Sequence, residues 1–265
     1  MKHAAIALFI AMACASLFAH DVSAASCRNF AREAQAAIGK PVAALQRLEH
    51  EASDRIKGLD SRPFDFLRDE AKKAATSATR DTVAREIAEK SGAAVLPPFD
   101  DWRIMAGAGT VGLEIVEEWP EVETIVTPLG GGGLLSGVAT AATALKPGVD
   151  VYGVEPRAGN DGEQSFKSGR IVTIDPPQTI ADGARTLAIG ERNFAVIRER
   201  VRDIVSVTDD VLLDAVKLAM YRTKLVIEPT GALGIAALLS GAIKPKGRTA
   251  IVVSGGNLDF TLLCR

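Results

Sequence analysis

Four consecutive glycines, Gly130 to Gly133, are the feature of this sequence that points most directly to chemistry. They follow an apolar, β-branched stretch over residues 123–128 and precede small residues that predict a helix up to Leu145. Glycine leaves the backbone N–H groups uncovered, and the amino end of a helix carries partial positive charge. The arrangement predicts an anion site, most often for a phosphate. The alternative is a tight turn that binds nothing, although four glycines in succession are more than such a turn requires.

The local pattern can be compared with two kinds of nucleotide site, a dinucleotide-binding fold and a P-loop. The strict G-x-G-x-x-G spacing is absent, but Gly131, Gly133 and Gly137 fit a looser form with one more residue. Glu155 follows at the end of the next expected strand, roughly where a dinucleotide fold places the acid that binds ribose. A nicotinamide-dinucleotide-binding domain is therefore one hypothesis. A P-loop is excluded, because no Gly-Lys-Ser/Thr follows the glycines.

The composition limits the chemistry further. The 265 residues include only three histidines, His3, His20 and His50, which argues against a histidine-based metal site and against a Ser-His-Asp triad. Hydrophobic residues make up 47% and charged residues 24%, as in a globular protein. The net charge of −2 argues against a basic surface for nucleic acid.

The elements that would position these residues alternate from about Thr82 onward. Apolar stretches separated by amphipathic or small-residue segments predict a three-layer α/β fold with a mostly parallel sheet. The expected strands are residues 93–96, 123–128, 149–154, 204–207 and 249–253, and the expected helices are residues 102–119, 133–145 and 209–222 and a helix after Pro229.

Seven short motifs occur in this part of the chain. They are Leu96–Asp101, Met105–Glu114, Pro128–Gly137, Gly153–Pro156, Ala181–Ala184, Glu228–Ala232 and Ser254–Asn257. In residue types, order and spacing the sequence resembles the fold-type II pyridoxal-phosphate enzymes, and among them the group of threonine dehydratase, serine dehydratase and serine racemase. The resemblance implies part of the large domain of that fold. One departure is Ala108, where relatives usually carry glutamine.

The resemblance implies a cofactor, pyridoxal 5'-phosphate, and an amino-acid substrate, with no nucleic acid as a partner. The family reaction removes water and then ammonia from threonine or serine and leaves a 2-oxo acid. A homo-oligomer and a place in amino-acid metabolism such as isoleucine biosynthesis are further implications. The residues that would contact the cofactor are Gly130, Gly131, Gly132, Gly133, Leu134, Glu228, Ser254, Gly255 and Asn257. A serine facing the pyridine nitrogen, in place of a carboxylate, would suit β-elimination over transamination.

A divalent cation is a second implication of the resemblance. Glu155, the carbonyl of Gly159 and Asp161 match the positions that bind a cation in some relatives, and oxygen ligands suit Mg²⁺ or Ca²⁺. The alternative for Asp161 is a helix cap before the segment that follows it. The alternative for Glu228 is a capping acid before Pro229.

The lysine that this family joins to the cofactor is expected in a Ser-Phe-Lys-x-Arg-Gly-Ala motif, which the sequence lacks. Lys167 follows Ser165 and Phe166, but the residues after it differ, so we interpret it as a surface lysine. No catalytic residue is assigned. The chain is therefore expected to be a truncated or pseudoenzyme form, inactive by itself.

The N-terminal third of the sequence predicts a secretory signal followed by a helical segment. Lys2, the apolar run of residues 4–19 and the small residues before Ser26 are typical of a secretory signal over residues 1–25. Residues 26–81 predict short helices or a linker, and residues 82–265 the enzyme-like domain. A secreted helical interaction module with an inert C-terminal domain is a further hypothesis. Cys27 and Cys264 would pair or stay as free thiols, and the signal favours export where the family resemblance favours the cytoplasm.

Overall fold

The computed structural model describes residues 77–92 and 94–264. The predicted signal, most of the predicted helical segment and Cys27 lie outside these residues. The chain divides into two compact units between Pro97 and Pro98. Helix α5 (Ser77–Ser91) belongs to the first unit, and all elements below belong to the second. The boundary that the sequence predicts at residue 82 stays a prediction.

A parallel four-stranded sheet is the centre of the second unit. Its order is β3-β2-β1-β4, with strands β1 (Thr124–Pro128), β2 (Asp150–Pro156), β3 (Asp203–Val207) and β4 (Thr249–Ile251). All five residues of β1 are buried, because β1 has a strand on each side and helices on each face. This confirms the predicted α/β class, in which helices cover both faces of a mostly parallel sheet.

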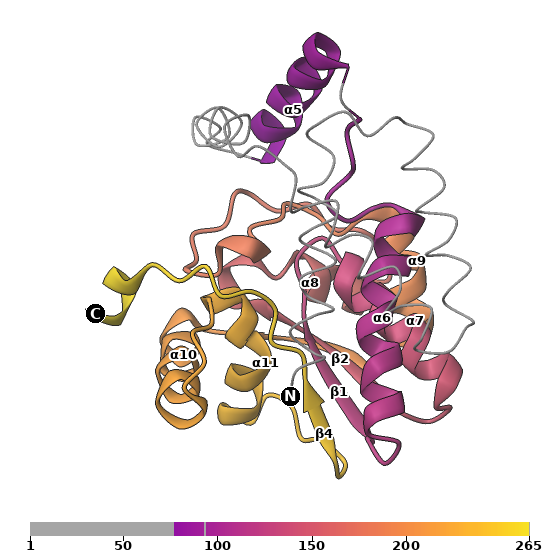
Figure 1. The fold of residues 1–265 in the computed structure, drawn as a ribbon, viewed down its shortest axis with the longest axis vertical. Helices are drawn as coiled ribbons and strands as arrows, with labels where there is room; N and C mark the ends of the chain where they lie inside the picture. The colour runs from indigo at the N-terminus through magenta and orange to yellow at the C-terminus, as the bar shows by residue number, and fades with distance from the viewer. Residues whose placement is uncertain (1–76, 93, 265) are drawn as a thin grey trace, which may run out of the picture. The chain divides into compact units, whose positions relative to one another are not determined.

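Helices cover both faces of the sheet (Figure 1). On one face α7 (Gly133–Leu145) and α9 (Glu191–Arg200) pack on the strands, and α6 (Trp102–Glu118) packs on α7. On the other face lie α10 (Asp209–Thr223) and α11 (Pro229–Leu239).

Alternate residues of the strands enter the two cores. Ile125 and Ile204 are fully buried in the cluster with α7 and α9, and Val126 and Val154 are fully buried in the cluster with α10 and α11. The sheet therefore joins two separate apolar cores.

Shorter elements complete the unit. Helix α8 (Asp161–Ser168) follows β2, and single 3-10 turns span Arg157–Gly159, Asp182–Ala184 and Phe260–Cys264. Within the described part of the chain, no helix is long and apolar enough to cross a membrane.

The order of the strands reverses at β1. The chain runs from β1 to β2 and β3 on one side and returns to β4 on the other side. Open α/β sheets bind ligands at the carboxyl ends of the strands where the order reverses. The loops after β1 and β4, which contain Gly130–Gly133 and Ser254–Asn257, both begin at this edge.

The helices expected over residues 102–119, 133–145 and 209–222 and after Pro229 are confirmed within one or two residues. The strand expected over residues 93–96 is wrong: residues 94–97 have no regular secondary structure, and Val95 is 46% exposed. An apolar run of this length fits a strand only where a neighbour pairs with it, and no described strand does. Strand β4 also ends earlier than expected, at Ile251, and α9 was not predicted.

Candidate functional site

The loop of Gly130–Gly133 connects β1 to α7 and leaves its amides open. Gly132 is the N-cap of α7, with φ of +101°, a conformation that favours glycine. Among the described residues, none accepts a hydrogen bond from the backbone N–H groups of Gly130 to Leu134. Five consecutive unpaired donors at the amino end of a 13-residue helix form a site for an anion with several oxygens.

Close packing explains why the loop has no side chains. A Cβ built on Gly131 would lie 2.2 Å from the ring of Phe99, and one on Gly133 would lie 3.1 Å from the Phe99 Cα. From the other side, the Gly190 N–H donates to the Gly131 carbonyl oxygen at 3.0 Å. The loop is therefore held between two segments that are distant in the sequence.

A second wall of the site comes from the turn at Gly183. A Cβ on Gly130 would lie 3.0 Å from the carbonyl oxygen of Gly183. The Gly183 N–H in turn donates to the hydroxyl of Thr230, in the first turn of α11, at 3.0 Å. These contacts bring the glycine loop, the 182–184 turn and the start of α11 to one place.

The loop after β4 joins the same place through α11. A Cβ on Gly231 would lie 2.5 Å from the carbonyl oxygen of Ser254. The Glu228 N–H donates to the carbonyl oxygen of Gly255 at 3.3 Å, and a Glu228 carboxylate oxygen accepts from the Asn257 N–H at 3.1 Å. Glu228 thus clamps the loop by its backbone and its side chain, and its carboxylate does not cap α11 as the alternative suggested.

Two side chains at this place differ in their surroundings: Ser254, in the loop after β4, and Glu228, the residue before α11. The Ser254 hydroxyl makes no hydrogen bond to any described residue, so it is open to a ligand. Burial raises the pKa of Glu228, the Asn257 N–H lowers it, and the charge of Asp182 raises it again. The structure therefore brings the predicted residues Glu228, Ser254, Gly255 and Asn257 together.

A cleft of about 440 Å³ opens beside Asn257 and Pro229. Asp182 and Arg185 also line it, and both belong to or follow the 181–184 motif, for which the sequence predicted no role. Phe99 and Asn193, which contact the glycine loop, were likewise not predicted as site residues; only the 96–101 motif pointed toward Phe99.

Glu155 is a fully buried carboxylate at the end of β2. Its two oxygens accept from the N–H groups of Gly162 at 3.1 Å and Glu163 at 2.8 Å, so it caps α8 from outside the helix. Burial raises its pKa well above the usual range, and the nearby Asp161 adds to this. A side chain whose oxygens are used in this way does not reach a ribose, so the site does not support the dinucleotide hypothesis.

Asp161 is also fully buried, as the first residue of α8. Neither carboxylate oxygen has a hydrogen-bond partner of good geometry among the described residues, nor has the Thr186 hydroxyl. Burial raises the pKa of Asp161 to about 7, although Thr186 is close enough to lower it somewhat. Asp161 does not cap α8, since Asn160 is the N-cap residue. The helix-cap alternative is therefore wrong.

The oxygens near Asp161 offer an incomplete ligand set for a cation. Glu155 interacts electrostatically with Asp161, and Gly159 lies between them in the sequence. No group of three or more His, Cys, Asp or Glu side chains that could hold a metal occurs in the described residues. A cation here would depend on backbone carbonyl oxygens and water.

Lys167 and Lys146 both make contacts away from the glycine loop. The Lys167 side chain is 61% exposed and pairs with Glu163, as expected of a surface lysine. Lys146 donates to the Pro120 carbonyl oxygen, at the amino end of β1, opposite the glycine loop.

Comparison with known proteins shows which proteins this chain is similar to. A family described as pyridoxal-phosphate dependent enzyme matches residues 67–255. The serine racemase of Schizosaccharomyces pombe is 48% identical over 182 residues, which are 68% of this chain and 56% of that protein. The L-threo-3-hydroxyaspartate ammonia-lyase of Saccharomyces cerevisiae has the same identity and coverage. The chain thus spans slightly more than half the length of these relatives.

Solved structures show the same relationship. A crystal structure of the threonine deaminase of T.th. aligns with a TM-score of 0.67 and 46% identity, covering 70% of this chain and 62% of that one. Maize serine racemase aligns with a TM-score of 0.68 and 38% identity, covering 72% and 60%. These comparisons give no support to a dinucleotide-binding domain or to an inert interaction module.

Proposed function

The chain belongs to the family of pyridoxal-phosphate dependent enzymes, and we propose that it binds pyridoxal 5'-phosphate at the carboxyl ends of β1 and β4. One observation carries the proposal. The five unpaired N–H groups of Gly130 to Leu134 and the unpaired Ser254 hydroxyl are joined by a continuous series of contacts through Gly183, Thr230 and Gly231.

The phosphate would lie at the glycine loop. The N–H groups of Gly130 to Leu134 would donate to its oxygens, and the amino end of α7 would favour its negative charge. The absence of a Cβ at Gly131 and Gly133, which Phe99 requires, also keeps the backbone within reach of the ligand.

The ring would lie toward the loop after β4. The Ser254 hydroxyl is the group available to meet the pyridine nitrogen, and Gly255 and Asn257 are held in place by Glu228. When bound, pyridoxal 5'-phosphate supplies an electron sink for chemistry at the α-carbon of an amino acid. A neutral hydroxyl beside the nitrogen favours a weaker sink than a carboxylate would.

We also propose a divalent cation at Asp161. Its two unpartnered, fully buried oxygens would be satisfied by Mg²⁺ or Ca²⁺. Glu155 and the Gly159 carbonyl oxygen would contribute from neighbouring positions, although Glu155 already accepts two hydrogen bonds. The cation would tie the start of α8 to the end of β2.

The substrate class follows from the relatives, which include serine racemases, a threonine deaminase and hydroxyaspartate ammonia-lyases. We propose descent from an enzyme that removes water and ammonia from threonine, serine or a related 3-hydroxy amino acid. The chain by itself is proposed to be inactive, because its sequence contains no Ser-Phe-Lys-x-Arg-Gly-Ala motif.

Binding is tested by titrating the full chain with pyridoxal 5'-phosphate, pyridoxal and NAD, followed by absorbance and by calorimetry. We expect saturable binding of pyridoxal 5'-phosphate, with pyridoxal at least about tenfold weaker because it lacks the phosphate. Tighter binding of NAD, or equal binding of pyridoxal, would contradict the proposed site.

Inactivity is tested separately with threonine, serine and 3-hydroxyaspartate in the presence of pyridoxal 5'-phosphate. We expect no 2-oxo acid, and no lysine carrying the cofactor after borohydride reduction and peptide mass spectrometry. Formation of 2-oxo acid together with a labelled lysine would show that the chain is an active enzyme.

A further inference from the structure

Asn193 lies directly beneath the glycine loop. It is fully buried in the first turn of α9. A Cβ built on Gly132 would lie 2.8 Å from the Asn193 Cβ, so the loop and this side chain are in van der Waals contact. A buried amide must satisfy two donors and an acceptor, and burying it without partners is costly.

The amide satisfies these requirements in one orientation. With Nδ2 toward the loop, it donates to the carbonyl oxygens of Gly131 and Phe99, both at 3.2 Å, and Oδ1 accepts from the Ser136 hydroxyl at 2.9 Å. The reverse orientation would place the amide oxygen against two carbonyl oxygens. The Ser136 hydroxyl also lies 2.7 Å from the Gly132 carbonyl oxygen, which accepts from the Ser136 N–H at 2.9 Å, and in this orientation of the amide the hydroxyl proton turns to Asn193 Oδ1.

These bonds fix the direction of a peptide plane in the loop. The Gly131 carbonyl oxygen accepts from both Asn193 Nδ2 and the Gly190 N–H. In a trans peptide the C=O and the following N–H point in opposite directions. Holding this carbonyl toward α9 therefore turns the Gly132 N–H away from α9, to the side where it has no partner among the described residues.

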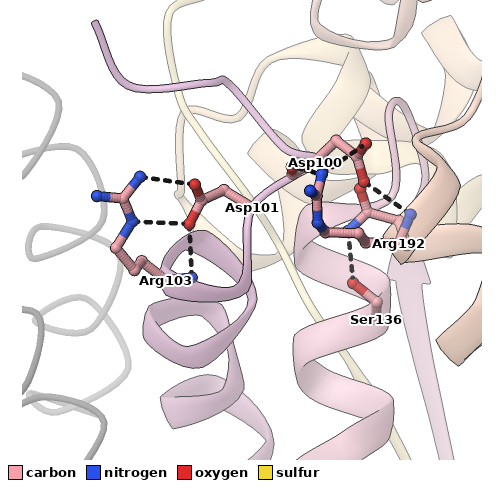
Figure 2. A network of polar contacts seen from close by, with 6 residues as sticks. Asp100, Asp101, Arg103, Ser136 and Arg192 are labelled. Atoms are coloured by element: carbon pink, nitrogen blue, oxygen red, sulfur yellow. Dashed lines mark hydrogen bonds and ion pairs between the residues drawn. The ribbon is translucent and has the colours of Figure 1, made fainter.

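The position of Asn193 is itself fixed by residues far away in the sequence. The N-cap of α9 is Gly190, which has no side chain to offer, and Asp100 takes its place by accepting from the Arg192 N–H at 2.9 Å. The Arg192 side chain also contacts Asp100. Figure 2 shows Asp100 and Arg192 facing each other, with Ser136 on the adjacent helix.

We propose that Asn193 is a positioning residue that aims the amides of the glycine loop at the phosphate. This inference rests on the proposed function for the identity of the ligand. Phe99 and Asn193 hold the loop from two sides, and the Asn193 side chain joins them by donating to both Gly131 and Phe99. Asn193 acts through the loop and does not itself contact the ligand.

The test compares Asn193→Leu with wild type. Leucine has the shape of asparagine without its donors, its acceptor or a charge. Leucine removes all three hydrogen bonds of Asn193, and we expect affinity for pyridoxal 5'-phosphate and for inorganic phosphate to fall about tenfold or more, the size expected when the two that hold Gly131 and Phe99 no longer orient the loop. In the ligand-free protein, the glycine-selective ¹⁵N resonances of Gly131 to Gly133 should also move.

The control is Thr124→Val, which removes a buried hydroxyl that accepts from the Lys246 N–H at the opposite end of β1. It should change neither the phosphate affinity nor the loop resonances. Ser136→Ala is a milder change that removes the hydroxyl shared by Asn193 and the Gly132 carbonyl oxygen. It should weaken phosphate binding about threefold, and it serves if Asn193→Leu fails to fold.

Two results would overturn the inference: phosphate affinity of Asn193→Leu within twofold of wild type, or unchanged glycine resonances. If the wild-type chain binds neither ligand, the proposed function is wrong. The resonance comparison then still decides whether Asn193 sets the geometry of the loop.

Discussion

Asp161 and Asp101 are two carboxylates whose surroundings shift their pKa values in opposite directions. Asp161 is buried without a partner among the described residues, which raises its pKa. Asp101 is the N-cap of α6, accepts from the Arg103 N–H at 2.8 Å and pairs with the Arg103 side chain, as Figure 2 shows. The Arg103 side chain and N–H lower the pKa of Asp101. A group held ionised by its partners is structural, whereas one buried without partners is available to a ligand.

Asp161→Asn should remove the response of the protein to divalent cations. We expect millimolar Mg²⁺ or Ca²⁺ to raise the midpoint of thermal unfolding of wild type, because a ligand that binds only the folded state stabilises it. The variant should show no such rise. The exposed Asp175→Asn should respond like wild type, and an equal response in both variants would show that the cation binds elsewhere.

Asp101→Asn should destabilise the protein in a pH-dependent way. Asparagine still caps α6, so only the ion pair is lost, at a cost below about 1 kcal/mol for such a surface pair. The pKa of Asp101 is lower in the folded state than in the unfolded state, so its contribution is present above about pH 4 and disappears as the pH falls. Urea unfolding of both proteins from about pH 3 to about pH 7 measures the difference, which should not grow toward low pH.

At the scale of elements, glycines decide how closely α6 and α7 approach. A Cβ on Gly112 of α6 would lie 2.6 Å from the Val138 carbonyl oxygen, and one on Gly137 of α7 would lie 2.4 Å from the Met105 carbonyl oxygen. The two helix backbones are therefore in direct contact. Phe99 lies just before the start of α6, and the glycine loop lies at the start of α7, so the close approach of the helices is consistent with the contact between Phe99 and the loop.

The two positions Gly132 and Gly107 should respond oppositely to alanine. Gly132→Ala introduces a side chain at φ of +101° and against Asn193, so we expect a loss of about 1–3 kcal/mol in the free energy of unfolding. Gly107 lies inside α6 with nothing within 4 Å of its Cβ position, so alanine there should stabilise by about 0.5–1 kcal/mol. Urea denaturation measures both, and a neutral Gly132→Ala would mean that the loop differs in solution.

At the scale of the whole molecule, one sheet joins two separate cores. Ile197 is buried in the cluster with α7 and α9, and Ile227 is buried in the cluster with α10 and α11. Because both clusters pack on the same strands, we expect the second unit to unfold as one cooperative structure.

Ile197→Val and Ile227→Val should therefore each cost about 0.5–1.5 kcal/mol, and the double variant should lose their sum within about 0.5 kcal/mol. Each variant should still show a single unfolding transition. Circular dichroism and tryptophan fluorescence would follow it, and two transitions at different denaturant concentrations would contradict the single sheet-centred unit.

Local patterns in the sequence determined the elements and the identity of the main loop. The β-branched stretch before Pro128, the glycines after it and the proline that begins α11 each act over a few residues, so they are readable without a structure. The seven short motifs between Leu96 and Asn257 predicted the family, which the comparisons confirm. The strand expected over residues 93–96 failed because a short apolar run becomes a strand only when another strand pairs with it.

Only the tertiary structure decided what these residues contact. It assigned the two oxygens of Glu155 to the start of α8 and left those of Asp161 without partners among the described residues. It also placed Asn193, which is distant from Gly132 in the sequence, beneath the glycine loop. Hydrogen bonds between distant segments, and the burial of side chains between them, depend on how the helices pack on the sheet. Local residue spacing does not determine that packing. The sequence by itself could therefore predict a phosphate loop, and only the fold could show what holds that loop in place.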